Sequence, residues 1–303
     1  MKCLTNSCEA CCRVLALGNF DGVHLAHQAV MEVAQTIAMV EGLRGAALSF
    51  LNHPRAVLEG KTPPLLTLPA EKALLASRCG LEEMILLPFD DELAEMEPEA
   101  FVRHILVGRC DAKHIVVGEN YSFGKGGRGD IALLDRLSRE MGFVLHVVPT
   151  MRVAGLEVSS TVIRERLLAG DVRTAAALLG RAYTIGGPIV HGRRIGRRMG
   201  FPTINIALPK GKLLPKFGVY FGYVTLGHDS QRHPAMFNLG FKPTVGSRTP
   251  TLEAYLLDFS GDIYGEAARI SFVARIRDEK RFDSIDALAA QIEKDVALAR
   301  KFY

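Results

Sequence analysis

Through about residue 180, the chain alternates short apolar runs with longer stretches in which apolar residues recur every three or four positions. The apolar runs predict five buried strands, at Val14–Leu17, Ala46–Phe50, Met84–Leu87, His114–Val117 and Val144–Val148. The periodic stretches predict helices at His24–Val40, Glu71–Cys79, Pro98–Val107 and Asp130–Met141. Because strand and helix alternate, we predict a doubly wound parallel sheet, with ligands bound at the carboxyl ends of its strands.

The pattern changes near residue 182, after a short helical stretch from Ser159 to Leu179. Short alternating runs separated by Gly, Pro, Asp and Ser follow, at Gly218–Leu226, Pro234–Asn238, Thr251–Leu257 and Ala268–Ala274. Such runs predict a small antiparallel barrel. A final helix that packs on the barrel is predicted from the apolar positions Ile285, Leu288, Ile292, Val296 and Ala299. We therefore expect two domains, residues 1–182 and 183–303.

Composition is that of an ordinary globular protein. The chain has 303 residues, of which 48% are hydrophobic and 23% charged. It shows neither a membrane-length apolar run nor a signal peptide, so we expect a cytoplasmic protein with no membrane partner. The net charge of +4 is compatible with small phosphate-bearing ligands and is weaker than expected of a dedicated nucleic-acid binder.

Four of the six cysteines, Cys3, Cys8, Cys11 and Cys12, lie in the first twelve residues. The Cys-x2-Cys spacing resembles half of a zinc site, but no second pair or nearby histidine completes a familiar set. We expect an unstructured N-terminal tail with reduced cysteines, since disulfides are rare in the cytosol.

Candidate chemistry begins where the first apolar run ends. Gly18 is followed by a short polar turn, and then by His24 and His27 as a helix begins. Spacing of three places both imidazoles on one helical face in the first turn, where free N–H groups and the helix dipole favour an anion. The pair therefore indicates a phosphate site, although two histidines on a helix face without a ligand would give the same pattern.

Six segments, taken in order, resemble the bacterial bifunctional riboflavin kinase/FAD synthetase family over nearly the whole chain. They are Gly-Asn-Phe-Asp-Gly-Val-His-Leu-Ala-His at 18–27, Ser-Phe-Leu-Asn-His-Pro at 49–54, Gly-Glu-Asn-Tyr-Ser-Phe-Gly at 118–124, Ser-Ser-Thr-Val-Ile-Arg at 159–164, Gly-Phe-Pro-Thr-Ile-Asn at 200–205 and Leu-Glu-Ala-Tyr-Leu-Leu-Asp-Phe at 252–259. The resemblance implies a nucleotidylyltransferase-type sheet domain, which adenylylates FMN to FAD, followed by a riboflavin kinase domain.

For the first domain, the resemblance implies ATP binding by one set of residues, with His24 and His27 also catalytic. The set is Gly18, Phe20, Asp21, His24, His27, Asn120, Ser159, Ser160, Thr161 and Arg164. Hydroxyls that open a helix, followed by an arginine one turn on, also suit a triphosphate on physical grounds. A plain helix N-cap remains the alternative for Ser159.

The chain departs from the family pattern at two places in this domain. Ala26 replaces a glycine, and its methyl group is expected to crowd the nucleotide. The segment 49–54 replaces the family's Thr-Phe-Asp-Pro-His-Pro and lacks its acidic side chain. The glycine-rich stretch with Lys125, Arg128 and Asp130 is interpreted either as a mobile loop over phosphates or as a plain surface loop.

For the second domain, the resemblance implies that Thr203 and Asn205 are oxygen ligands of Mg²⁺ and that Glu253 is the catalytic base. The resemblance also implies that ATP or flavin is bound by Gly192, Arg197, Thr203, Asn205, Glu253 and Arg277. An outward-facing glutamate on an alternating strand is the structural alternative for Glu253.

Three functions remain open from sequence. The favoured hypothesis is an enzyme that uses ATP to convert riboflavin to FMN and FMN to FAD. The second keeps the kinase and makes the adenylyltransferase weak or inactive. The third is a flavin- or nucleotide-sensing binding protein. The sequence does not indicate an oligomeric state.

Overall fold

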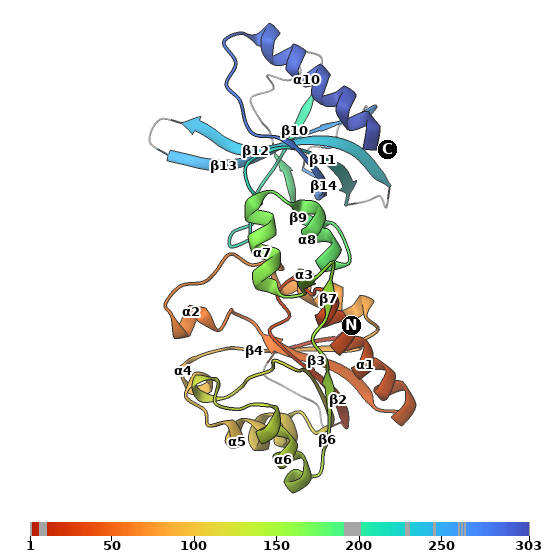
Figure 1. Ribbon diagram of the computed structural model, residues 1–303, viewed down its shortest axis with the longest axis vertical. Helices are drawn as coiled ribbons and strands as arrows, with labels where there is room; N and C mark the ends of the chain where they lie inside the picture. The colour runs from red at the N-terminus through yellow and green to blue at the C-terminus, as the bar shows by residue number, and fades with distance from the viewer. Residues whose placement is uncertain are drawn as a thin grey trace. The chain divides into compact units, whose positions relative to one another are not determined.

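The computed structural model describes residues 2–5, 11–190, 201–227, 231–244, 247–259, 261, 263 and 265–302 (Figure 1). They form two compact units, Met1–Val162 and Ile163–Tyr303. Each unit has its own sheet and its own core. The helices in the described part of the chain include none long and apolar enough to cross a membrane.

The first unit is built on a six-stranded parallel sheet with the order β1-β4-β3-β2-β5-β6. Its strands are β1 (Lys2–Thr5), β2 (Arg13–Leu17), β3 (Arg44–Phe50), β4 (Glu83–Leu87), β5 (Ala112–Gly118) and β6 (Val144–Val148). The five predicted strands are confirmed, but the predicted burial is wrong for β6, because it lies at the edge of the sheet and its Val144 and Val147 are 49% and 43% exposed. The predicted unstructured tail is wrong for residues 2–5, because they pair with β4 at the edge of the sheet. Cys8 lies outside the described residues.

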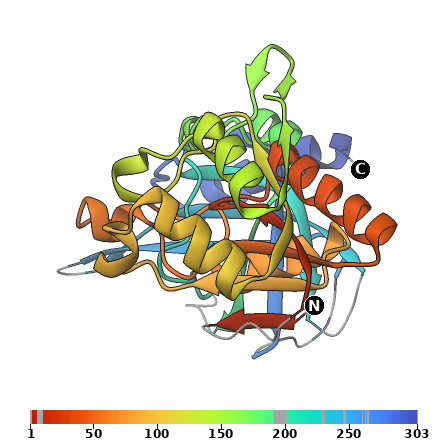
Figure 2. The same cartoon turned by 90° about the horizontal axis from the view of Figure 1, so that it is seen from below.

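Helices cover both faces of this sheet. They are α1 (Leu25–Glu41), α2 (Arg55–Leu58), α3 (Pro69–Arg78), α4 (Asp91–Ala94), α5 (Pro98–Ala100), the π-helix η1 (Phe101–Arg109), the 3₁₀ turn η2 (Lys125–Gly127) and α6 (Ile131–Met141). One apolar cluster joins the sheet to α1 and α3, and a second joins it to η1 and α6, so that α1 lies on the opposite face from η1 and α6 (Figure 2). A short hairpin, β7 (Arg152–Val153) and β8 (Leu156–Glu157), follows the last strand.

The second unit is a closed antiparallel barrel with the strand order β10-β13-β12-β11-β14-β9. Its elements are α7 (Ser160–Ala169), which spans the division between the units, α8 (Val172–Leu179), β9 (Tyr183–Val190), β10 (Thr203–Ile206), β11 (Gly218–Leu226), β12 (Arg232–Thr244), β13 (Ser247–Leu256), β14 (Ala267–Arg277), α10 (Ile285–Ala299) and η3 (Arg300–Phe302). The predicted antiparallel barrel and final helix are thus confirmed.

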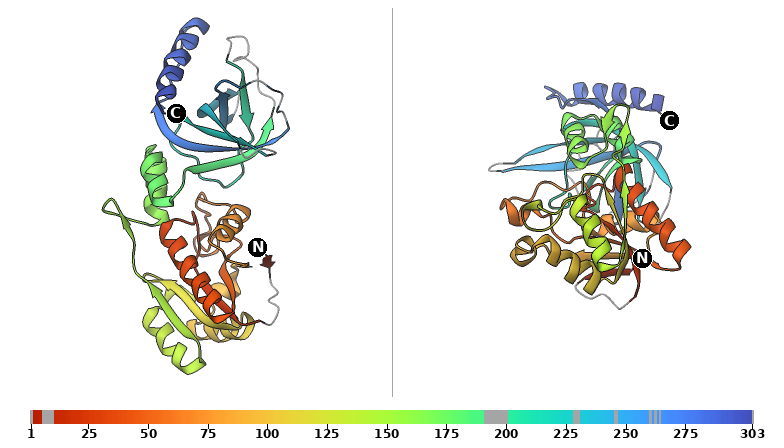
Figure 3. Two further views of the ribbon diagram at one scale, coloured as in Figure 1. Left: turned by 90° about the vertical axis from the view of Figure 1, so that its right-hand side faces the viewer. Right: turned by 60° about the horizontal axis from the view of Figure 1, so that its bottom comes forward.

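The final helix lies along the outer surface of the barrel in both views of Figure 3. Val296 and Ala299 of α10 pack into a cluster with Phe221 and Met236. A buried ion pair adds to this contact, because Arg277 of β14 reaches Asp295 of α10 with a distance of 2.7 Å from its terminal nitrogen to Oδ2.

The division between the units falls after Val162, earlier than the predicted boundary at residue 182. The reason is that α7 and α8 belong with the barrel: the amide of Lys216 donates to the carbonyl of Leu167 at 2.9 Å, and α8 packs against β9 and β14. Which of the two boundaries delimits a fragment that folds alone stays a prediction.

Candidate functional site

A cleft of about 270 Å³ opens at the carboxyl ends of β2 and β5 in the first unit. Its lining brings together segments that are far apart in the sequence: Leu17, Gly18, Asn19, Phe20, His24, Ala26, His27, Val30, Gly118, Glu119, Asn120, Tyr121, Val148, Pro149, Thr150, Met151, Glu157, Val158 and Ser159. Six residues predicted to bind ATP are among them, namely Gly18, Phe20, His24, His27, Asn120 and Ser159.

The turn from β2 into α1 has an unusual backbone. Phe20, Gly22 and Val23 have φ angles of 51°, 90° and 39°. These angles lie in the left-handed region, which residues other than glycine rarely adopt. Phe20 and Val23 are both buried, so the surrounding core holds them in this conformation. Backbone strain of this kind is typical of functional sites, where the rest of the fold compensates for it.

This turn aims two histidines into the cleft. His24 is the N-cap of α1, and its Nδ1 accepts a hydrogen bond from the amide of His27 at 3.3 Å. The two imidazole rings stack with their centroids 3.5 Å apart, and the rings of His27 and Phe20 are nearly perpendicular with their centroids 5.2 Å apart. Both imidazoles therefore lie at the first turn of α1, where the amides of Leu25 and Ala26 have no partner within the helix.

Asp21 lies outside the lining of this cleft. Its side chain is only 1% exposed and accepts hydrogen bonds from the amides of Leu66 and Thr67 at 3.2 and 2.9 Å. The hydroxyl of Ser160 donates to the carbonyl oxygen of Asp21 at 2.7 Å. These contacts make Asp21 and Ser160 supports of the turn, and their contact with ATP stays a prediction.

Glu119 and Thr150 are among the cleft residues that sequence reasoning missed. The carboxylate of Glu119 accepts from the amide and hydroxyl of Thr150 at 3.0 and 2.9 Å, and these hydrogen bonds hold its pKa below the usual range. Asn120 donates to the same hydroxyl at 3.4 Å. The sequence signal that could have identified Glu119 is its position directly before Asn120, at the end of a predicted strand.

Ser159 lines the cleft and also resembles an N-cap, because its hydroxyl accepts from the amide of Val162 at 3.4 Å. Thr161 and Arg164 follow on the same helix, α7, and are not part of the cleft lining. The contact of Thr161 and Arg164 with the triphosphate stays a prediction.

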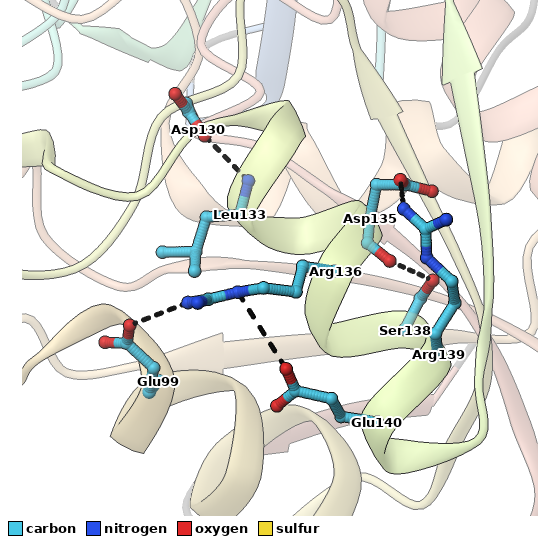
Figure 4. A network of polar contacts seen from close by, with 8 residues as sticks. All are labelled: Glu99, Asp130, Leu133, Asp135, Arg136, Ser138, Arg139 and Glu140. Atoms are coloured by element: carbon cyan, nitrogen blue, oxygen red, sulfur yellow. Dashed lines mark hydrogen bonds and ion pairs between the residues drawn. The ribbon is translucent and has the colours of Figure 1, made fainter.

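The glycine-rich stretch has structural contacts for each of its charged residues. Lys125 pairs with Glu95 and Arg128 with Glu97. Asp130 caps α6 by accepting from the amide of Leu133 at 2.8 Å (Figure 4). These contacts favour the surface-loop interpretation.

The second candidate site lies on the outer face of the barrel. Strand register places Asn205 of β10 opposite Glu253 of β13, and Glu253 opposite Asn238 of β12. The neighbouring Ile204, Leu252 and Ala254 are buried, so Thr203, Asn205 and Glu253 alternate to the outside. Asn205 is nevertheless only 6% exposed. The oxygen-bearing side chains of Asn205, Glu253 and Asn238 thus share one row across three strands.

Other residues predicted for this site are not brought to that row. Arg277 is held by Asp295, with a second hydrogen bond from its Nε at 2.9 Å, and this contact anchors the final helix. Its role toward ATP or flavin stays a prediction. Gly192 and Arg197 lie outside the described residues.

Models of two protein families match the chain, each over most of one unit. The FAD synthetase model matches residues 7–162 and the riboflavin kinase model matches residues 179–303. The bifunctional riboflavin kinase/FMN adenylyltransferase of Listeria monocytogenes is 37% identical over 294 residues, which cover 96% of this chain and 92% of that protein. The chain belongs to the bifunctional riboflavin kinase/FMN adenylyltransferase family.

The similarity extends over nearly the whole length of the chain. The Escherichia coli K12 enzyme of the same name is 35% identical over 296 residues, covering 97% of this chain and 93% of the relative. The crystal structure of a macrolide-efflux protein from Streptococcus pneumoniae superposes with a TM-score of 0.90 at 30% identity, covering 99% of each chain. The predicted fold and family are confirmed.

The two departures from the family pattern differ in position, since residues 49–54 are not part of the cleft lining. Ala26 contributes to the wall of the cleft. Ser49, which stands where the family has threonine, is buried and donates from its hydroxyl to the carbonyl oxygen of Asn19 at 2.9 Å. The hydroxyl of the motif is therefore kept.

Proposed function

We propose that the first unit transfers the adenylyl group of ATP to FMN, giving FAD, and that the second unit transfers the γ-phosphoryl group of ATP to riboflavin, giving FMN. The observation that carries this proposal is that each unit matches one of the two family models over most of its length. ATP, riboflavin and FMN are then the small-molecule partners, and the cytoplasm is the expected location.

Adenylyl transfer needs no covalent intermediate with the protein. A phosphate oxygen of FMN attacks the α-phosphorus of ATP in line, the bond to the bridging oxygen breaks, and pyrophosphate leaves. The protein therefore acts by positioning and by stabilising negative charge. His24, His27 and the free amides of the first turn of α1 are the donors that would contact these phosphates.

Riboflavin phosphorylation needs a proton acceptor. Glu253 would accept the proton of the 5′-hydroxyl while that oxygen attacks the γ-phosphorus and ADP leaves. The site fits Mg²⁺, because the Thr203 hydroxyl and the Asn205 amide oxygen are hard ligands on one face, next to Glu253 in the register. Bound there, Mg²⁺ would neutralise part of the charge on the phosphates of ATP.

A second candidate function has one observation in its favour. The methyl group of Ala26 stands in the wall of the adenylyltransferase cleft, where the family has glycine. A kinase with a weak adenylyltransferase would follow if this methyl group displaced the nucleotide.

A crossed pair of substitutions tests the assignment of one reaction to each unit. Glu253→Gln keeps the shape of the side chain and removes the base, so FMN formation should fall by about 10²–10⁴-fold. His24→Ala should abolish FAD formation from supplied FMN and leave the phosphorylation of riboflavin at the wild-type rate. A Glu253→Gln protein that phosphorylates riboflavin like the wild type would refute the kinase assignment.

A further inference from the structure

Lys72 of α3 is a buried lysine next to the adenylyltransferase cleft. It is 5% exposed, although lysine is among the residues that are most rarely buried. Its position in the first turn of α3 is also electrostatically unfavourable, because the helix dipole favours anions there. A cation kept in such a place requires compensating contacts.

The ammonium group has an acceptor for each of its three hydrogens. Nζ lies 2.7 Å from the carbonyl oxygen of Asn19, 3.1 Å from the hydroxyl of Ser49 and 3.5 Å from the carbonyl oxygen of Phe50. These acceptors follow or end two adjacent parallel strands, β2 and β3. Lys72 therefore joins the two sequence motifs at the carboxyl edge of the sheet.

The contact to Asn19 reaches the catalytic histidines through the backbone. Asn19 precedes Phe20, whose left-handed φ of 51° requires support from outside the turn. The ring of Phe20 in turn contacts the imidazole of His27. Ser49 reinforces the contact by donating to the same Asn19 carbonyl.

We propose that Lys72 is a positioning residue for adenylyl transfer: its ammonium group fixes the peptide of Asn19, and thereby the turn that presents Phe20 and His27 to the phosphates of ATP. This inference rests on the proposed function of the first unit. It also accounts for Ser49, whose hydroxyl is both an acceptor for Lys72 and a donor to Asn19.

The contact is titratable within a range that an assay can reach. Burial lowers the pKa of Lys72 to about 8, and the charge of Asp21 opposes part of this shift. The other titratable side chains near Lys72 are Asp21 and His53, which line the same small cavity. Glu71, on the same helix, accepts a hydrogen bond from the amide of Leu68. Above this pKa, Nζ has one hydrogen fewer and no charge.

The test compares FAD formation from FMN with FMN formation from riboflavin, in the same full-length protein, across about pH 6 to pH 10. In the wild type, FAD formation should fall by about tenfold for each pH unit above the pKa of Lys72, whereas FMN formation should lack this limb. Lys72→Met should lower FAD formation by at least about tenfold and remove the alkaline limb. Lys72→Arg should restore part of the rate and move the limb to higher pH.

Lys61→Met, at an exposed position of the same unit, is the matched control and should behave like the wild type. A Lys72→Met protein with the wild-type rate and pH profile overturns the inference. If Lys72→Met does not fold, the wild-type and Lys72→Arg profiles decide, and an alkaline limb that is absent or equal in both overturns the inference. A wild-type protein that forms no FAD at any pH refutes the proposed function, and the inference fails with it.

Discussion

Replacing Ala26 by glycine is expected to strengthen the binding of ATP for adenylyl transfer. Ala26 is the second residue of α1, directly before His27, and its methyl group is part of the cleft wall. The backbone amide beneath that methyl group is one of the first-turn amides that have no partner within the helix. Glycine would let a phosphate approach this amide more closely.

The magnitude follows from the loss of one methyl contact. Relief of overpacking by one methyl group is worth about 1 kcal/mol, which corresponds to an approximately fivefold lower KM for ATP. Glycine also costs up to about 1 kcal/mol of helix stability, so the free energy of unfolding should decrease while affinity increases. The assay is the rate of FAD formation from FMN as a function of ATP concentration, together with urea unfolding.

Ala29→Gly is the matched control, because Ala29 lies in the same helix and does not line the cleft. It should lower stability and leave the KM for ATP unchanged. If Ala26→Gly and Ala29→Gly have the same KM as the wild type, the methyl group does not crowd the nucleotide and the argument is refuted.

Three further predictions concern stability. The pKa of Lys72 is about 8 in the folded state, against an ordinary value of 10.5, so the unfolded state binds more protons between these two pH values. The free energy of unfolding should therefore rise by about 3 kcal/mol between pH 8 and pH 10.5. In urea unfolding, Lys72→Met should lack this rise. Asp295→Ala leaves the mostly buried Arg277 without its acidic partner and should lower the free energy of unfolding by about 3 kcal/mol. Arg300→Ala breaks an exposed ion pair with Asp258 and should change the free energy of unfolding by less than about 1 kcal/mol. An equal effect of both substitutions would refute the anchoring role of Asp295. The fragments 163–303 and 183–303 should both retain kinase activity. The longer fragment should unfold at a higher denaturant concentration, because it keeps α8, which packs against β9 and β14. A short fragment that is unfolded would refute the boundary at residue 182.

The most clearly patterned of the predicted strands are those buried on both faces. Val14–Leu17 and Met84–Leu87 are continuous apolar runs because helices cover both sides of a parallel sheet. β1 was missed because Lys2–Thr5 is an edge strand of four residues with no apolar pattern. β9 was missed because glycine and proline interrupt it, and β10 was missed because it has only four residues, two of them polar.

The candidate site was predictable where a motif supplies the cleft lining directly. His24, His27 and Asn120 are of this kind, because strand ends and a helix start place them. Asp21 was not, because its environment depends on Leu66 and Thr67, which lie far away in the sequence. Lys72 was missed because its partners Asn19 and Ser49 are also far away in the sequence. A single lysine in a helix gives no sequence signal of burial.

The most direct test of the central claim is product analysis of the purified chain with riboflavin, ATP and Mg²⁺. Chromatography over time should show FMN appearing first and FAD following, because the product of the kinase is the substrate of the adenylyltransferase. FMN that accumulates without FAD would contradict the bifunctional assignment and favour the weak adenylyltransferase. Riboflavin that remains unchanged would contradict both activities and leave a binding protein.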